Sequence, residues 1–260
     1  MIKEINILGK HGWQYIPDLE DVTLPETFRG RPVISDAITN EEAVRLKECC
    51  PVYAIETSPV FSIHLGKCLF CGECSHVCPD RIRFTNDFRM AVTREEHLVI
   101  KAGSAEPVYP DVLAIRPEIR RLFRHSLKLR QVSAGGDNST EMELNAAGNV
   151  NFDMGRFGIS FVAAPRHADG IVLTGPVTAN MAHALRMTWE AIAEPKILVL
   201  AGTDAISGGL FLKNTAIDRS FLSSIKPDLY LPGNPVHPLT VIHGLTALMG
   251  VRIRGGIPRK

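Results

Sequence analysis

The second half of the chain alternates short apolar runs with helical patterns. Four runs are almost wholly apolar and end at Gly or Pro, which predicts buried strands: FGISFVAAP, GIVLTGP, KILVLAGT and DLYLPG. Between them, residues 178–193 have helical spacing after Thr178, a favoured N-cap residue, and residues 238–250 form a second helical pattern closed by Gly250. Strand, helix and strand at this spacing predict a parallel α/β sheet.

Residues 111–130 combine helical spacing with a strong basic bias. Five apolar residues recur at helical intervals: Ile115, Ile119, Leu122, Phe123 and Leu127. Six Arg and Lys residues lie largely on the other faces of this pattern. The segment is therefore interpreted as a basic amphipathic connector, either a solvated helix face or a surface that docks on an acidic or membrane-embedded partner.

These patterns divide the chain into three parts. Residues 1–108 are rich in turns and form a first domain with an N-terminal extension. The basic connector covers residues 109–132, and the α/β domain covers residues 133–260, beginning with a stretch dominated by Gly and polar residues.

The composition restricts the class of protein. The 260 residues are 45% apolar and 22% charged, which is typical of a packed globular protein. The 29 Lys and Arg residues against 28 Asp and Glu residues give a formal net charge of +1, so the overall charge does not favour nucleic acid as a partner. No stretch approaches the roughly 20 apolar residues that span a bilayer, and the N-terminus lacks the apolar core of a secretory signal. We therefore expect a cytoplasmic chain.

All six cysteines lie between Cys49 and Cys78. A compact cysteine cluster in a cytosolic chain predicts a metal site rather than a disulfide framework. Cys68, Cys71, Cys74 and Cys78-Pro79 follow the C-x2-C-x2-C-x3-C-P spacing of bacterial ferredoxins. In proteins with two such motifs, the last cysteine of each motif binds the other motif's cluster.

A second motif of this kind is present but incomplete. Cys50-Pro51 matches its end, whereas Asn40, Ala43 and Leu46 stand where its other cysteines would be. The crossover rule predicts one 4Fe-4S cluster with the following ligands: Cys50, Cys68, Cys71 and Cys74. Two alternatives stay open, namely Cys78 as the fourth ligand, and zinc bound by four of the thiolates.

The chain resembles two subunits of one kind of respiratory machine. FRGRPVI, Cys50-Pro51, GKCLFCGECSHVCP and FTNDFRMAVTREEHL resemble the two-cluster ferredoxin subunit of complex I and of energy-converting NiFe hydrogenases. RHADGIVLTGPVT and DLYLPGNPVHP resemble the small, proximal-cluster (20 kDa-like) subunit of the same machines. The resemblance implies a fusion, with an α+β ferredoxin-like iron-sulfur domain followed by an α/β flavodoxin-like parallel-sheet domain.

The second part departs from the pattern of the small subunit at every cluster ligand. The residues at those four positions are Asp137, Thr140, Asp204 and Asn234. Their oxygen atoms are hard ligands, which do not replace thiolates around iron and sulfur. We expect a degenerate cluster site filled by a hydrogen-bonded polar plug, and a magnesium or calcium site is the alternative.

The resemblance implies a function as well as a fold. It implies an iron-sulfur electron-transfer subunit, without catalytic residues, of a membrane-associated complex I-like or hydrogenase-related oxidoreductase complex. The partners would be a hydrogenase-like or complex I-like large subunit, membrane subunits, and a ferredoxin or another redox donor. The chain would be peripheral on the cytoplasmic face of the membrane through those subunits. The alternative is a scaffold or assembly subunit whose cluster is structural and transfers no electrons.

Overall fold

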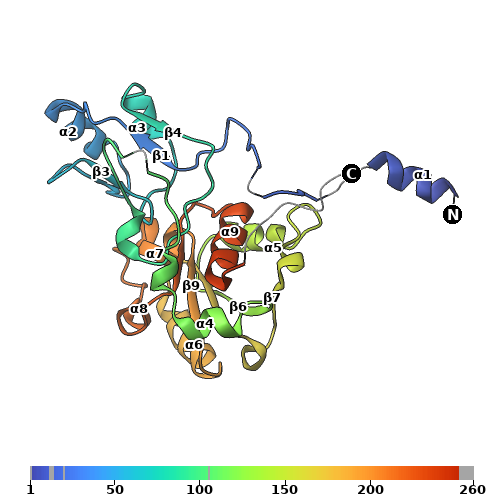
Figure 1. Cartoon of the computed structure of the whole chain (residues 1–260). Coiled ribbons are helices and arrows are strands. Elements are labelled where there is room, and N and C mark those ends of the chain that lie inside the picture. The colour runs from blue at the N-terminus through green and yellow to red at the C-terminus, as the bar shows by residue number, and fades with distance from the viewer. Residues whose placement is uncertain (1, 12–14, 20, 105, 252–260) are drawn as a thin grey trace.

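The computed structural model describes residues 2–11, 15–19, 21–104 and 106–251. Helix α1 (Ile2–His11) stands apart from the rest of the chain in Figure 1. The remaining N-terminal segments form the upper part in that view, with short strands, and the C-terminal segments form a lower part around a larger sheet. No helix in the described part of the chain is long and apolar enough to cross a bilayer.

The lower part is built on a parallel sheet. Within the described residues, five strands pair in the order β10-β9-β8-β6-β7, and all neighbours are parallel. The strands are β6 (Leu127–Ser133), β7 (Ile159–Phe161), β8 (Gly170–Thr174), β9 (Ile197–Ala201) and β10 (Leu229–Leu231). Every residue of β8 and β9 is buried, as expected where helices cover both faces of a parallel sheet. The predicted flavodoxin-like parallel α/β sheet is thus confirmed.

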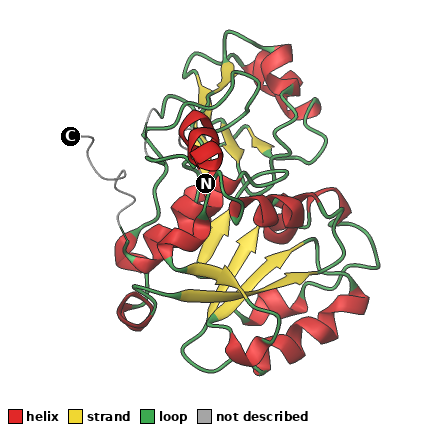
Figure 2. Cartoon of the chain, turned by 90° about the vertical axis from the view of Figure 1, so that its right-hand side faces the viewer, coloured by secondary structure: helices red, strands yellow, loops and turns green. Residues whose placement is uncertain are grey.

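Helices pack on both faces of this sheet (Figure 2). They are α4 (Pro117–Leu122), α5 (Ser139–Ala147), α6 (Ala179–Glu190), α7 (Thr203–Ser207), α8 (Ser220–Ser224) and α9 (Pro238–Met249). Short 3-10 turns connect them: η2 (Val112–Ala114), η3 (Met154–Phe157), η4 (Pro165–His167) and η5 (Gly209–Phe211). Leu173 of β8 shares a core with Leu185 of α6, whereas its neighbour Val172 shares another core with Leu144 of α5. Alternate strand residues therefore support the two helical layers.

The two helices predicted from the sequence begin and end close to the expected residues. Thr178 is the N-cap of α6 and has an extended backbone, although its side chain makes no capping hydrogen bond. Gly250 ends α9 with a left-handed φ of +72°, which glycine adopts without steric cost.

The predicted helical connector is wrong after Leu122. Residues 127–133 form strand β6, which lies between β8 and the edge strand β7, so the sheet begins within the segment assigned to the connector. Leu127 and Leu129 are fully buried while Lys128 between them is exposed. This two-residue alternation determines the structure here, and the apparent helical spacing was a coincidence of apolar positions.

The upper part contains antiparallel strands. In the described residues, β1 (Pro32–Ile34) pairs with β4 (Ile82–Phe84), and β3 (Ser62–His64) pairs with both β2 (Ile55–Glu56) and β5 (Val99–Lys101). The helical segments here are α2 (Asn40–Glu48), α3 (Glu73–Val77) and the 3-10 turn η1 (Glu95–Leu98).

The upper part is packed against one end of the parallel sheet. Val92 and Tyr230 of β10 exchange backbone hydrogen bonds of 3.0 and 2.8 Å. Leu65 and Cys68 belong to the same buried core as Leu200 of β9. The cysteine-bearing segment is therefore fixed at the carboxyl ends of the strands, where parallel sheets usually place functional loops.

Candidate functional site

The intact cysteine motif folds as a loop that runs into a short helix. Cys68 and Cys71 lie in the loop, and Cys74 lies in α3. Gly72 precedes α3 with a φ of +87°, and Phe70 has a φ of +53°. Because side chains rarely adopt a φ near +87°, the glycine permits the tight turn between Cys71 and Cys74.

One small cavity, of about 20 Å³, is lined by the four cysteines that the sequence predicts as cluster ligands: Cys50, Cys68, Cys71 and Cys74. The rest of its wall is largely apolar and includes Ile55, Ile63 and Phe84. Cys68 and Cys74 are buried, whereas Cys71 is exposed. Three cysteines from one loop-and-helix segment thus line the same space as a fourth cysteine from a separate segment.

Two of these sulfur atoms accept hydrogen bonds from backbone amides. Ala54 N–H donates to Cys50 Sγ at 3.2 Å, and Phe70 N–H donates to Cys68 Sγ at 3.3 Å. Burial raises the pKa of Cys68 and of Cys74 to about 12, and the neighbouring thiols add to the effect. Such thiols keep their protons at neutral pH unless a metal cation replaces them.

The four cysteines that line this cavity supply soft sulfur donors, as an iron-sulfur cluster requires. Within the described ranges, no three His, Cys, Asp or Glu side chains are grouped to hold one metal ion. Zinc takes its four thiolates at one point, at about 2.3 Å each. A 4Fe-4S cluster takes one thiolate on each of its irons, and amide donors to sulfur tune its potential. Soft donors spread around an apolar cavity suit the cluster.

The other two cysteines do not line this cavity. Cys78 is 5% exposed, and its Sγ accepts a hydrogen bond from Arg45 Nη2 at 3.7 Å. The Cys49 thiol donates to the carbonyl oxygen of Leu46 at 3.2 Å, and burial raises its pKa. The structure therefore brings Cys50, and not Cys78, to the cavity wall.

The incomplete cysteine motif is folded as helix α2. Asn40, Ala43 and Leu46 all lie on this helix, and the side chain of Leu46 is fully buried. Thr39 and Glu42 form a capping box at its start, with hydrogen bonds of 3.2 and 2.8 Å. Apolar packing and a capped helix thus form the segment of the incomplete motif.

Two carboxylates of the degenerate site lie near each other at the carboxyl end of the sheet. Asp137 accepts hydrogen bonds from Ser139 N–H at 2.9 Å and Ser139 Oγ at 2.6 Å, which lower its pKa. Burial raises the pKa of Asp204, the charge of Asp137 raises it further, and Arg219 opposes the shift. Arg219 also donates to the backbone carbonyl of Asp204 at 3.2 Å. The Asp137 carboxylate is thus hydrogen-bonded within the chain, whereas the pKa of Asp204 stays raised despite the nearby Arg219.

The other two positions of the degenerate site differ in their surroundings. Thr140 is 9% exposed and lies against Gly202, where a Cβ atom would come 2.7 Å from its Oγ1. Asn234 lines a separate cavity that also contains Phe70 and His237. Gly202 has a φ of +88°. Both this left-handed backbone conformation and the close contact with Thr140 therefore favour glycine at this position.

Two residues important to this region were not predicted from the sequence. Thr203 is fully buried and donates through its hydroxyl to the carbonyl oxygen of Cys68 at 2.8 Å. Glu141 is 5% exposed, and its Oε1 accepts hydrogen bonds from the hydroxyls of Ser133 and Thr174 at 2.5 and 2.6 Å. Their partners are mostly distant in the chain, so no local pattern identifies them.

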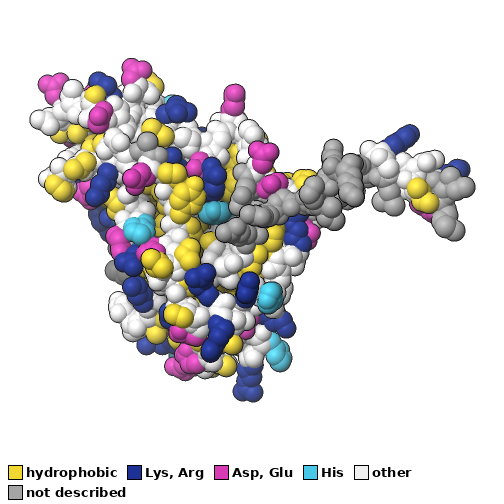
Figure 3. All heavy atoms as spheres, in the orientation of Figure 1, with side chains coloured by type: hydrophobic (Ala, Val, Ile, Leu, Met, Phe, Trp, Pro, Cys, Tyr) yellow, Lys and Arg dark blue, Asp and Glu magenta, His cyan; other side chains and the backbone are white. Residues whose placement is uncertain are grey.

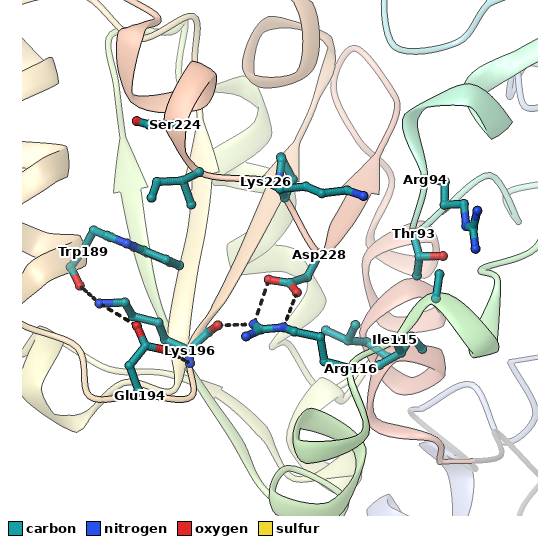
Figure 4. Close-up of a pocket in the computed structure, with 14 residues that line it drawn as sticks. Thr93, Arg94, Ile115, Arg116, Trp189, Glu194, Lys196, Ser224, Lys226 and Asp228 are labelled. Carbon is teal, nitrogen blue, oxygen red and sulfur yellow. Dashed lines mark hydrogen bonds and ion pairs between the residues drawn. The ribbon is translucent and has the colours of Figure 1, made fainter.

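A wider cavity of about 530 Å³ lies where β9 and β10 begin (Figure 4). Arg116 Nε donates to Asp228 Oδ1 at 3.1 Å, and Lys196 Nζ donates to the Trp189 carbonyl at 2.9 Å. No ligand position predicted from the sequence lines this cavity. Its central charges pair with each other, which is typical of a structural network.

Comparisons with known proteins identify relatives of the second part. Residues 138–248 match the family described as NADH ubiquinone oxidoreductase, 20 Kd subunit. Over 130 residues, the chain is 30% identical to the probable membrane-bound hydrogenase subunit mbhJ of Pyrococcus furiosus, and the match covers 49% of this chain and 78% of that protein. The family match begins well after the cysteine segment.

Two further relatives carry related names. The chain is 30% identical over 140 residues to formate hydrogenlyase subunit 7 of Escherichia coli, covering 54% of this chain and 55% of that protein. It is 36% identical over 107 residues to an NADH-quinone oxidoreductase subunit of Citrifermentans bemidjiense, covering 41% of this chain and 62% of that protein. The chain thus spans little more than half the length of these two relatives.

Proposed function

The chain belongs to the family of the NADH ubiquinone oxidoreductase 20 kDa subunit, and we propose that it is an iron-sulfur subunit of a membrane-associated hydrogenase-like or complex I-like assembly. It binds one 4Fe-4S cluster through Cys50, Cys68, Cys71 and Cys74. It carries electrons and supplies no catalytic residue. A large subunit and membrane subunits of that assembly hold it at the cytoplasmic face of the membrane, and a ferredoxin or another redox protein donates the electrons.

The observation that carries this proposal is the cavity shared by the four thiols. Cys50 comes from a segment separate from the loop of the other three, as the ferredoxin crossover requires. When bound, the cluster supplies one-electron transfer. The chain surrounds it with apolar side chains, directs the amides of Ala54 and Phe70 at two of the sulfurs, and leaves Cys71 exposed on the side from which a donor approaches.

We further propose that the chain is a fusion. Residues 1–108 form a ferredoxin-type module, and the 20 kDa-like module includes strand β6 (Leu127–Ser133), so it begins within the segment 109–132 that the sequence pattern assigned to a connector. The antiparallel strands of the upper part and the ferredoxin spacing of its cysteines support this division. The backbone bridge between Val92 and Tyr230 gives the two modules a fixed contact.

A second candidate function follows from the degenerate site. Asp137, Thr140, Asp204 and Asn234 offer oxygen and amide groups in place of thiolates, so electrons leaving the first cluster have no second cluster to enter within this chain. The hydrogen bonds from Ser139 to Asp137 support an internally satisfied polar site. On this view the subunit is a scaffold that joins soluble and membrane modules, and its cluster is structural.

One experiment tests both functions. The full chain is purified without oxygen, and its iron, acid-labile sulfide, zinc and visible spectrum are measured. Electron transfer requires about four irons and four sulfides per chain and an absorbance that dithionite bleaches reversibly. An intact cluster that dithionite does not reduce favours the scaffold. Zinc in place of iron, or eight irons, contradicts the single 4Fe-4S cluster.

A further inference from the structure

A basic and apolar surface surrounds the short helix α4. It forms a shallow groove whose lining includes Val112, Leu113, Arg120, Arg121 and Arg124. We call this groove and its rim the α4 surface. In the lower middle of Figure 3, where α4 lies in Figure 1, blue Lys and Arg side chains stand beside yellow hydrophobic ones. The electron-transfer role proposed above does not use this surface.

The apolar component of the α4 surface is held outward by the fold. Leu113 is 93% exposed, and Val112 beside it is 42% exposed. The carboxylate of Asp111 accepts a hydrogen bond from Leu113 N–H at 2.9 Å, which caps the turn η2. Asp111 is itself paired with Arg94 at 3.1 Å. Leu113 therefore projects from a capped turn.

The basic component has a surplus of charge. Arg120, Arg121 and Arg124 are exposed, and none of them forms an ion pair with a residue that the structure describes. The nearby acidic groups are already paired, Asp111 with Arg94 and Glu118 with Arg116 at 3.8 Å. Three positive charges thus remain around the exposed leucine.

We infer that the α4 surface binds an anionic lipid membrane directly. Guanidinium groups pair with lipid phosphates in a fork geometry, and basic residues near an anionic surface are attracted to it. A side chain as exposed as Leu113 is removed from water by a fluid apolar layer, which needs no shaped pocket to receive it. The inference rests on this surface alone and requires neither the cluster nor the partner subunits.

Vesicle sedimentation tests the inference on the full chain. We expect binding to vesicles of phosphatidylcholine mixed with phosphatidylglycerol, weak binding to phosphatidylcholine alone, and loss of binding at high salt. Replacing Arg120, Arg121 and Arg124 together by Gln is expected to weaken binding roughly 100-fold, because each basic residue contributes about 1 kcal/mol near the surface and 1.4 kcal/mol is a factor of ten. Leu113→Ser is expected to weaken binding about tenfold.

A matched variant separates a local surface from total charge. Arg83, Lys101 and Arg166 are exposed and do not line the groove, so their joint replacement by Gln removes the same charge and is expected to leave vesicle binding nearly unchanged. The inference is overturned if the chain binds neutral vesicles as well as it binds anionic ones, or if both triple variants lose the same amount of vesicle binding. So does a chain that ignores the vesicles but binds polyglutamate through the three α4 arginines, since the surface then recognises an acidic protein. The cluster's spectrum, read in the same samples, reports the proposed function independently.

Discussion

The hydroxyl of Thr203 donates a hydrogen bond of 2.8 Å to the carbonyl oxygen of Cys68, although 135 positions separate the two residues. The same hydroxyl lies 3.2 Å from the carbonyl oxygen of Gly233. A single buried side chain thus connects the cysteine loop, the end of β9 and the loop after β10. Nearby, a Cβ on Gly66 would come 2.5 Å from Ile206 Cγ2, so the loop is packed against α7 without spare room.

Thr203→Val is expected to destabilise the protein and its cysteine loop. Valine has nearly the same shape, but it leaves the buried carbonyl of Cys68 without its donor, which costs about 1–3 kcal/mol. Urea unfolding measures the loss of stability, and the rate at which a chelator removes iron measures the effect on the loop.

Thr188→Val is the control for this prediction. The Thr188 hydroxyl is near the surface and donates to the Ala184 carbonyl of its own helix at 2.8 Å, so the change in the free energy of unfolding should stay within about 0.5 kcal/mol. Equal effects of the two variants would show that the contact with Cys68 contributes nothing special.

Cys50→Ser is expected to damage the cluster more than Cys78→Ser. Cys50 lines the cavity with the other thiols, whereas Cys78 is turned to Arg45 at 3.7 Å. Iron content and the visible spectrum of the purified variants measure the difference. Cys49→Ser serves as the control, because its thiol donates to the Leu46 carbonyl outside the cavity wall. Loss of the cluster in Cys78→Ser, with an intact spectrum in Cys50→Ser, would assign the fourth ligand to Cys78.

The sequence predicts the parts of the fold that depend on local chemistry. The apolar runs of β8 and β9 and the glycine at the end of α9 are readable because each residue's neighbours in sequence determine its role. Leu127–Ser133 was assigned incorrectly because Leu127 fits both a helical and an alternating pattern, and only the position of β6 between β7 and β8 decides between them.

As with the fold, the sequence predicts the part of the candidate site that depends on local spacing, which is the cysteines, but not the contacts that support them. Cysteine spacing predicts Cys68, Cys71 and Cys74 as a group and, through the crossover rule, Cys50 as their partner; these four residues line one cavity. The contacts of Arg45 with Cys78 and of Thr203 with Cys68 join segments far apart in the chain. Such contacts arise from tertiary packing, which a single sequence does not display.

Buried histidines make stability depend on pH. Burial lowers the pKa of His243 from 6.5 to about 4, and the nearby Arg89 adds to this shift while Asp87 opposes it. Between about pH 6.5 and pH 4 the unfolded chain binds a proton at this site that the folded chain does not bind. The free energy of unfolding should therefore be highest above pH 6.5 and fall as the pH approaches 4.

His243→Gln is expected to flatten this dependence, because glutamine does not titrate. Urea unfolding at pH 7 and pH 5 measures it, with the difference between the two pH values as the readout. Burial also lowers the pKa of His237 to about 4, and this residue continues to titrate in the variant. Part of the dependence of stability on pH should therefore remain. A variant whose stability falls as steeply as that of the parent protein would exclude His243 as a source.

The degenerate site should respond to cysteine and not to hard cations. The Asp137 carboxylate accepts two hydrogen bonds from Ser139, and the charge of Arg219 opposes the rise in the pKa of Asp204. Magnesium or calcium at millimolar concentration should therefore leave the melting temperature nearly unchanged. A cation present at 100 times its dissociation constant would add about 2.7 kcal/mol. A rise of several degrees would therefore refute the polar plug.

Replacing Asp137, Thr140, Asp204 and Asn234 together by Cys is expected to raise the iron content to about eight, if the four positions converge as those of the resembled small subunit do. Iron that stays at about four in a folded quadruple variant would show that they do not.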